Sequence, residues 1–272
     1  MIQAEENKAK IAKQIEEVRI FYPDLEVISE NNYDVVLAGE LCFRAQYDNL
    51  EEIVDSYILR IEVPVDFSIL AHPKVFEIAG KINRTYHRYI SGALCFGVPF
   101  SVKMCLWEKG DSLLCFIENL LIPYLYAHSY YMKNKRMPFG HYGHSDDEFY
   151  FYYKKYFAGI PDERLLDFLL VAYRPSIYRM HRQCLCGSGK IMRKCHGHQI
   201  KLLSDLHPQR FLKQDIEKVV SSLHKRDVNS NTMVSKRLRS RIFNEYIKEL
   251  EKDIKNLSLN NSKFSINYNR CG

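Results

Sequence analysis

Residues 184–197 read "CLCGSGKIMRKCHG", and they constrain the chain more than any other stretch does. Cys184 and Cys186 form one close pair of possible metal ligands, and Cys195 and His196 form a second. Zinc prefers four soft or borderline ligands at tetrahedral corners, and two close pairs joined by a short turn bring such ligands together at low loop-closure cost. The sequence therefore predicts a zinc site with these four residues as ligands.

The residues between the two pairs favour the same interpretation. Gly187 and Gly189 permit the positive φ angles that turn a backbone around an ion, and Lys190, Arg193 and Lys194 offset thiolate charge. The alternative is a set of free cysteines in a basic loop. His198 is a second candidate for the fourth ligand.

Four protein ligands leave no coordination position open for water, so the pattern predicts a structural zinc rather than a hydrolytic one. Cys-x-Cys-Gly-Ser-Gly, followed after a short basic stretch by Cys-His, resembles the zinc motif at the C-terminus of the SecA translocase, known as SEC-C. The departure is Leu185, where that motif usually has Pro. The resemblance implies a binding element that docks a partner.

The other cysteines indicate a reducing compartment. Four of them, Cys42, Cys95, Cys105 and Cys115, lie singly among apolar residues instead of forming a disulfide-like framework. No apolar run approaches the roughly 18 residues of a membrane span, and the charged N-terminal stretch does not resemble a signal peptide. We therefore expect a cytoplasmic protein without a membrane partner.

Charge is distributed unevenly along the chain. Residues 1–174 contain 19 Lys or Arg and 25 Asp or Glu, whereas residues 175–272 contain 20 and 8. A basic C-terminal part allows contact with nucleic acid, the ribosome or an acidic protein, and charge alone does not choose among them.

Hydrophobic patterning predicts an α+β fold. A helix is expected over 4–20, an antiparallel meander over 27–65, irregular loops packed on the sheet after it, and a long helix over 111–135 that Pro123 kinks or divides. Further helices are expected over 162–174, 208–225 and 235–257. The predicted organisation is a first domain over 1–160, a connecting helix over 161–183, the zinc motif over 184–199, a helical tail over 200–257 and a disordered end over 258–272.

The first 155 residues resemble the ubiquitin-conjugating enzyme family in their order of elements: a helix, a four-stranded antiparallel meander, a Pro-containing loop, a cysteine and a long helix. The local resemblance lies in "AHPKVFEIAGKINRTYHRYISGALCF", which supplies Pro73, Val75, Gly80, Ile82, His87, Gly92, Leu94 and Cys95. This resemblance implies that Cys95 carries an acyl group as a thioester, which an amine then attacks. The alternative is that Cys95 is a small buried hydrophobic residue.

Two departures from the family pattern concern the catalytic loop. Arg88 and Tyr89 stand where the family has Pro and Asn, and His87 precedes Cys95 by eight residues instead of ten. The family's Asn helps to stabilise the oxyanion formed during aminolysis. Its absence means either that Tyr89, Ser91 or a backbone N–H replaces it, or that no aminolysis takes place.

The segment "FGHYGHSDDEF" is a further candidate for chemistry. In the conjugating fold a loop downstream of the long helix can approach the cysteine, so His144 or Asp146 could deprotonate the attacking amine. The pair His141 and His144 could instead bind a metal, which would favour a zinc hydrolase. The simplest alternative is a solvated polar loop.

Two functions follow from these observations. The first is a conjugating-like transferase of a bacterial antiphage operon, as the resemblance implies. Such a protein would receive a ubiquitin-like modifier or a nucleotidyltransferase C-terminus, with the help of an activating enzyme. The second is a catalytically inactive adaptor that binds a protein, the ribosome or nucleic acid through its zinc motif and basic tail.

Overall fold

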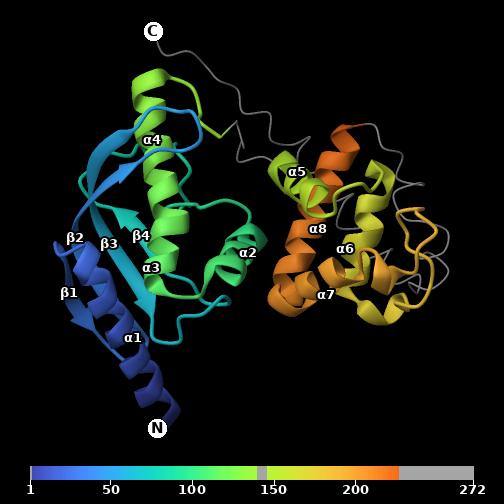
Figure 1. The fold of residues 1–272 in the computed structure, drawn as a ribbon, viewed down its shortest axis with the longest axis horizontal. Coiled ribbons are helices and arrows are strands. Elements are labelled where there is room, and N and C mark those ends of the chain that lie inside the picture. Colours follow the sequence, from blue (N-terminus) through green and yellow to red (C-terminus); the bar gives the residue numbers. More distant parts are fainter. Residues whose placement is uncertain (1, 140–145, 227–272) are drawn as a thin grey trace, which may run out of the picture. The chain divides into compact units, whose positions relative to one another are not determined.

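The computed structural model describes residues 2–139 and 146–226 of the 272-residue chain. The chain divides into two compact units, residues 1–142 and residues 143–272, which we call the first and second units (Figure 1). The boundary therefore precedes the division at residue 160 that the sequence suggested. The predicted helix over 235–257 and the predicted disordered end over 258–272 lie outside the described residues.

The first unit begins with α1 (Ile2–Phe21) and a four-stranded antiparallel sheet in the order β1-β2-β3-β4. Its strands are β1 (Leu25–Glu30), β2 (Asp34–Ala45), β3 (Ile53–Pro64) and β4 (Lys74–Glu77). The predicted meander is confirmed in its first three strands. The fourth strand comes from the segment predicted as irregular loops, because four residues next to a proline give too short an alternating pattern to detect.

Alternation along the strands separates the two faces of the sheet. Leu37, Leu41 and Leu59 are fully buried and share one core with Ile15 of α1. The opposite face keeps Cys42 and Val54 exposed, so Cys42 is not the buried thiol that its apolar neighbours suggested.

Gly39 explains how β1 and β2 approach each other. It lies opposite Leu25 with a φ of 150°, and a Cβ atom there would lie 1.7 Å from the carbonyl oxygen of Asp24. Only glycine leaves room for this backbone contact.

The rest of the first unit is helical. It contains α2 (Pro99–Lys109), α3 (Leu113–Phe116), a π-helical turn (Ile117–Leu121) and α4 (Ile122–Asn134). Together, α3, the π turn and α4 form the predicted long helix, and Ser112 caps it by accepting a hydrogen bond from the N–H of Cys115 at 3.1 Å. The π turn ends just before Pro123, which lacks the N–H that would otherwise bond the carbonyl of Asn119. That carbonyl instead accepts the thiol of Cys105 at 3.8 Å.

The second unit is helical in its described part. Its elements are α5 (Asp146–Tyr156), a 3-10 turn (Asp162–Arg164), α6 (Leu165–Tyr173), short 3-10 turns at Pro175–Ile177 and Met192–Lys194, α7 (Gly197–Leu206) and α8 (Gln209–Lys225). The predicted helices over 162–174 and 208–225 are confirmed. The sequence pattern missed α5 and did not separate α7 from the helical tail.

The core of the second unit forms where α5, α6 and α8 pack on one another. Phe157, Phe168 and Ile216 are fully buried there. The carboxylate of Asp215, also buried, accepts a hydrogen bond from the hydroxyl of Tyr153 at 2.5 Å and lies 3.0 Å from Nε2 of His207. These contacts satisfy a charge that would be costly to bury alone. Among the described residues, no helix has both the length and the apolar character needed to cross a membrane.

Candidate functional site

The zinc-motif residues form a compact knuckle in the second unit. Its two arms, residues 182–186 and residues 190–196, are joined by backbone hydrogen bonds. The N–H of Cys184 donates to the carbonyl of Lys190 at 2.6 Å, and the N–H of Met192 donates to the carbonyl of Arg182 at 2.7 Å. Gly187 and Gly189, with φ angles of 84° and 75°, make the turn between the arms. The predicted role of these two glycines is confirmed, because both adopt the left-handed region.

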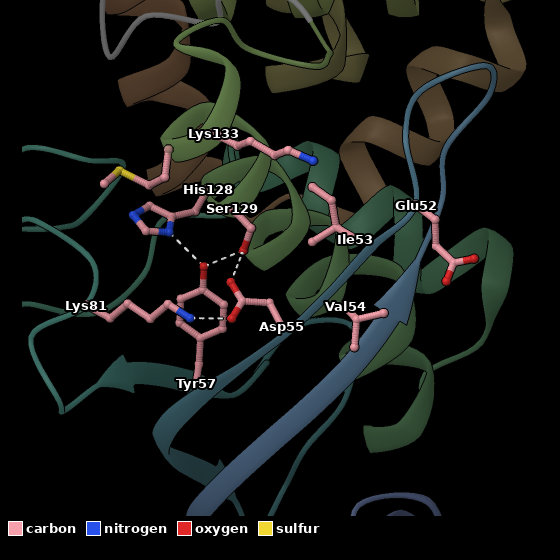
Figure 2. A pocket seen from close by; sticks show the side chains of 10 residues that line it. Glu52, Ile53, Val54, Asp55, Tyr57, Lys81, His128, Ser129 and Lys133 are labelled. Carbon is pink, nitrogen blue, oxygen red and sulfur yellow. Dashed lines mark hydrogen bonds and ion pairs between the residues drawn. The ribbon is translucent and has the colours of Figure 1, made fainter.

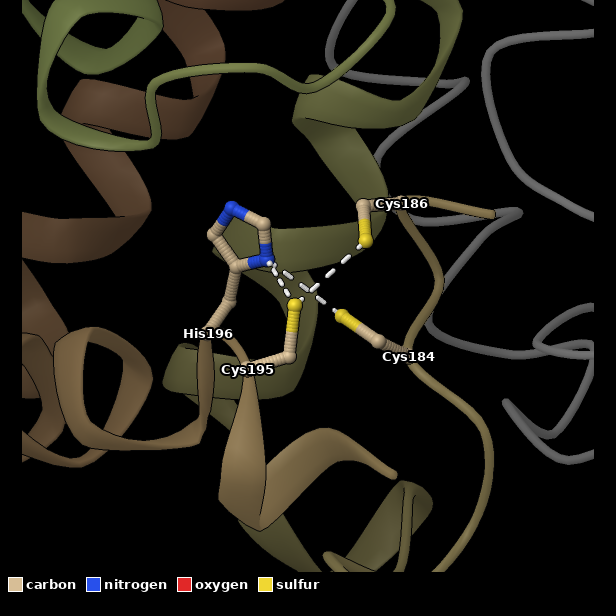
Figure 3. A group of neighbouring side chains, drawn as sticks. All are labelled: Cys184, Cys186, Cys195 and His196. Atoms are coloured by element: carbon tan, nitrogen blue, oxygen red, sulfur yellow. Dashed lines mark hydrogen bonds between the residues drawn. The ribbon is translucent and has the colours of Figure 1, made fainter. Parts of the chain in front are cut away.

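The knuckle brings together the side chains of Cys184, Cys186, Cys195 and His196 (Figure 3). One ligand atom from each lies within 4.8 Å of the others, so the four could hold a metal ion. The Sγ atoms of Cys186 and Cys195 are 3.6 Å apart, which is too far for a disulfide, whose sulfurs are about 2.05 Å apart.

His196 turns its Nδ1 atom toward the sulfurs, at 3.4 Å from Sγ of Cys184 and 3.2 Å from Sγ of Cys195. Its Nε2 atom lies 3.3 Å from the carbonyl oxygen of Ala158, and its ring packs edge-on against Phe168. If Nε2 carries the proton and donates to that carbonyl, Nδ1 is left with a lone pair for a metal. The other candidate ligand, His198, lines a neighbouring cavity and is not part of the group.

Two of the cysteine thiols differ in acidity. Burial raises the pKa of Cys184 to about 12. Burial also opposes ionisation of Cys186, but hydrogen bonds from the side chain and backbone of Ser188 and from the thiols of Cys184 and Cys195 together outweigh it and lower the pKa of this thiol to about 6. The Oγ atom of Ser188 lies 3.1 Å from the sulfur of Cys186, so the Gly-Ser-Gly turn supplies both the bend and a donor to a thiolate.

In the first unit, Cys95 lies in the loop between β4 and α2 and is partly exposed. Its N–H donates to the carbonyl of His87 at 2.8 Å, and the N–H of Leu94 donates to the carbonyl of Val75 in β4 at 2.8 Å. The loop thus forms a small hairpin from 87 to 95 that is attached to the edge of the sheet. Its tip is closed by a bond from the N–H of Gly92 to the carbonyl of Tyr89.

Arg88 anchors this hairpin. Its Nη2 atom donates to the carboxylate of Glu77 at 3.0 Å and to the carbonyl oxygen of Glu77 at 3.2 Å. The Glu77 carboxylate also accepts the N–H groups of Ala79 and Ile82. Both charged side chains are almost completely buried, with 11% and 0% of their area exposed. Arg88 was noted in the sequence only as a departure from the family pattern, so its structural role was missed.

A cavity of about 220 Å³ adjoins the hairpin. Leu94 and Phe96, the two neighbours of Cys95, line it together with Tyr89, Ser91 and His72. The structure therefore places Tyr89 and Ser91, two of the predicted replacements for the family's Asn, at a cavity that the neighbours of Cys95 line, although Cys95 itself is not among the lining residues. The ring of His87 packs against the ring of Tyr86, with centroids 5.1 Å apart, while the carbonyl of His87 accepts the N–H of Cys95.

Three predicted residues remain: Asp146, which belongs to the second unit, and the histidines at 141 and 144. Asp146 begins α5 in the second unit, where its carboxylate accepts a hydrogen bond from Ser221 at 2.6 Å and pairs with Lys218 and Lys225 of α8. His141 and His144 lie outside the described residues.

A buried polar network that the sequence did not indicate joins β3 to α4 (Figure 2). The hydroxyl of Tyr57 lies 2.8 Å from Nδ1 of His128 and 2.6 Å from Oγ of Ser129. Ser129 in turn donates to the carboxylate of Asp55 at 2.7 Å, which pairs with Lys81 at 2.5 Å. These residues line a cavity of about 530 Å³.

Two groups in this network, His128 and Asp55, have lowered pKa values. Burial, reinforced by the positive charge of Lys81, lowers the pKa of His128 to about 4, so its ring is neutral at pH 7. Burial opposes ionisation of Asp55, but hydrogen bonds from Lys81 and Ser129 outweigh it and lower the pKa of this carboxyl. Each group therefore has a partner suited to its charge, and we interpret the network as the connection that fixes α4 on the sheet.

α4 also contacts the loop that leads to Cys95. The hydroxyl of Tyr124 donates to the carbonyl oxygens of Tyr86 and His87 at 3.2 and 3.1 Å, and the Tyr86 ring lies edge-on to His128 with centroids 4.8 Å apart. The carbonyl of His87 is the group that receives the N–H of Cys95. Tyr124 therefore links α4 to the backbone that holds Cys95 in place.

Comparison of the chain with models of protein families, with curated proteins and with solved structures finds no match in any of the three.

Proposed function

We propose that the chain is a ubiquitin-conjugating-like acyl transferase whose carrier is Cys95, with a structural zinc ion bound by Cys184, Cys186, Cys195 and His196. The observation that carries the proposal is the placement of Cys95. It is partly exposed, its N–H is held by the carbonyl of His87, and its two neighbours Leu94 and Phe96 line a cavity in the loop that follows a four-stranded antiparallel meander. This order of elements supports the family resemblance that the sequence suggested.

The reaction consists of two acyl transfers. In the first, the thiolate of Cys95 attacks the carbonyl carbon of a modifier held as a thioester on an activating enzyme; a new C–S bond forms and the activating enzyme's thiolate leaves. In the second, an amine of the target attacks the same carbon, an amide C–N bond forms, and the Cys95 thiolate leaves while the amine's proton passes to a base or to water. A thioester suits both steps, since a thiolate leaves readily.

The residues around Cys95 would have separate roles. We assign the hydroxyl of Tyr89 to the oxyanion, because Tyr89 lines the same cavity as Leu94 and Phe96, the neighbours of Cys95, and stands where the family has the Asn with this role. His87 would act as a positioning residue through its carbonyl. No step is assigned to Asp146, whose carboxylate is bound by α8, or to His144.

The dimensions of the cysteine and histidine cluster support zinc. With Zn–S bonds of about 2.3 Å and Zn–N bonds of about 2.0–2.1 Å, tetrahedral geometry separates two sulfurs by about 3.8 Å and a sulfur and a nitrogen by about 3.6 Å. The spacings in the cluster are 3.6 Å between Cys186 and Cys195 and 3.4 Å between Cys184 and His196. Three thiolates and one imidazole fill the coordination sphere, which is typical of a structural zinc.

The carrier role can be tested by intact mass spectrometry of the protein isolated from its own host. Wild type should show an adduct that thiols remove, and Cys95→Ser should show the same adduct as an oxygen ester that thiols leave in place. Cys42→Ser is the matched control, because Cys42 is also a cysteine of the first unit and is exposed. The proposal fails if the adduct persists as a thiol-labile species in Cys95→Ser, or if wild type remains bare in the presence of its activating enzyme and modifier.

A further inference from the structure

Among the described residues of the second unit, the excess of positive charge lies in the stretch that contains the knuckle. Residues 174–210 contain eight Lys or Arg, all of them exposed, and one acidic residue, Asp205. Lys201 pairs with Asp205 at 2.6 Å. Three thiolates and one Zn²⁺ ion together carry one negative charge, which offsets only a small part of the excess of Lys and Arg. The segment thus remains strongly positive with the metal bound.

Six of these cations belong to segments that the fold holds together, and we call them the knuckle surface: Arg179, Arg182, Lys190, Arg193, Lys194 and Lys201. The N–H of Arg193 bonds the carbonyl of Met180 at 2.9 Å, and the N–H of Met192 bonds that of Arg182 at 2.7 Å. The segment that carries Arg179 and Arg182 therefore runs beside the one that carries Arg193 and Lys194.

A cavity of about 500 Å³ opens within this surface. Pro175, Met180 and Ile200 supply apolar contacts, Arg193 and Lys201 supply positive charge, and Asp205, the partner of Lys201, adds one carboxylate. His198 and Ser204 add groups that can form hydrogen bonds. The volume lies in the range typical of small-ligand pockets.

We propose that the knuckle surface binds single-stranded nucleic acid, with phosphates on its Arg and Lys side chains and a base in the cavity. Guanidinium groups bind phosphate oxygens in a bidentate manner, and a strand supplies phosphates at regular intervals. A nucleobase is a flat ring with apolar faces and polar edges, which matches apolar walls accompanied by His198 and Ser204. An acidic peptide without aromatic or apolar side chains would satisfy the charge but would supply no flat ring for this cavity. The inference concerns the second unit and does not depend on the role of Cys95.

The test is fluorescence anisotropy of a labelled single-stranded RNA of mixed sequence with the zinc-loaded full chain, titrated at several salt concentrations. Each phosphate contact on a single strand contributes about −0.7 to the slope of log K against log salt, so three to six engaged cations predict a slope of roughly −2 to −4. Arg182→Gln/Arg193→Gln should weaken binding about tenfold or more and flatten the slope by roughly 1.4. Its zinc content should stay unchanged, because both arginines are exposed and neither is a ligand.

Lys13→Gln/Arg84→Gln is the matched control. It removes two exposed charges from the first unit and should leave the affinity for RNA unchanged. A polyglutamate peptide should displace the RNA at least tenfold less effectively than unlabelled RNA of equal charge. The proposal is overturned if the RNA does not bind at low salt, if both double variants weaken binding equally, or if polyglutamate competes as well as RNA does.

Discussion

Removal of zinc should unfold the knuckle while leaving the first unit intact. Structural zinc sites contribute on the order of 10–16 kcal/mol of apparent binding free energy, which is comparable to the whole stability of a typical domain. The knuckle's two arms are joined by backbone hydrogen bonds around a Gly-Ser-Gly turn, and its buried apolar side chains, Leu185 and Met192, are few compared with a domain core. His196 contributes to its attachment to the helices, because it contacts Phe168 and the carbonyl of Ala158.

Metal content and two structural signals measure this effect. A strong chelator should remove one zinc per chain, lower the helical circular dichroism and expose the chain near residue 190 to protease. The fluorescence of Trp107, the one tryptophan of the chain and part of α2 in the first unit, should not change. Cys195→Ser should weaken zinc binding by more than the roughly 10- to 100-fold that loss of an outer-shell partner costs.

His198→Ala is the control for the metal site, because His198 is an exposed neighbour outside the ligand group. It should keep its zinc. Loss of zinc from His198→Ala, or an unchanged protease pattern after complete removal of the metal, would contradict the assignment of the four ligands.

Arg88→Ala should destabilise the first unit by roughly 3–5 kcal/mol, because removing one partner leaves an uncompensated buried charge. The charge left behind is the carboxylate of Glu77, whose side chain is fully buried. Two backbone N–H groups still donate to it, but the guanidinium supplies the opposite charge. Urea unfolding followed by Trp107 fluorescence reports the loss in the first unit alone.

Two further variants test whether the loss of stability comes from the ion pair between Glu77 and Arg88 or from the loss of any arginine. Arg84→Ala, four residues earlier in the same loop, removes an exposed arginine and should leave the stability within about 0.5 kcal/mol of wild type. Glu77→Gln/Arg88→Leu removes both charges and should recover a large part of the loss. If the double variant is destabilised by as much as the sum of Glu77→Gln and Arg88→Leu measured singly, the coupling between Glu77 and Arg88 is absent and the interpretation is wrong.

The metal cluster could be predicted because its information is local. All four ligands lie within thirteen consecutive residues, and the two glycines that turn the chain lie between them. The first three strands and α8 were predicted for a related reason, since their periodicity extends over six residues or more.

The elements that the sequence missed have weak local patterns. β4 has four residues, and α5 contains the aromatic run "FYFYY", whose composition is typical of a strand. Two buried tyrosines of α5, Tyr150 and Tyr153, are spaced as on one helix face and pack toward α8. Tertiary packing therefore decides the structure of this segment.

The polar contacts that surround the Cys95 loop could not be predicted, because they join residues far apart in the chain. Tyr57 and His128 are separated by 71 positions, and Tyr124 lies 37 positions from His87. Arg88 and Glu77 are closer, and one signal was present: a glutamate inside the apolar stretch "KVFEI" requires a buried partner. A charged residue within a short apolar stretch thus indicates that an oppositely charged side chain lies nearby.

The most direct test of the transferase role is discharge of the isolated Cys95 adduct by free lysine. Protein that carries the adduct is freed of its activating enzyme, mixed with increasing lysine at constant pH, and followed by mass spectrometry of both the protein and the released group. We predict that the protein returns to its bare mass, that the released group carries lysine through an amide bond, and that the rate rises in proportion to lysine concentration. Release of the group only as a free acid, at a rate independent of lysine, would contradict transfer to an amine.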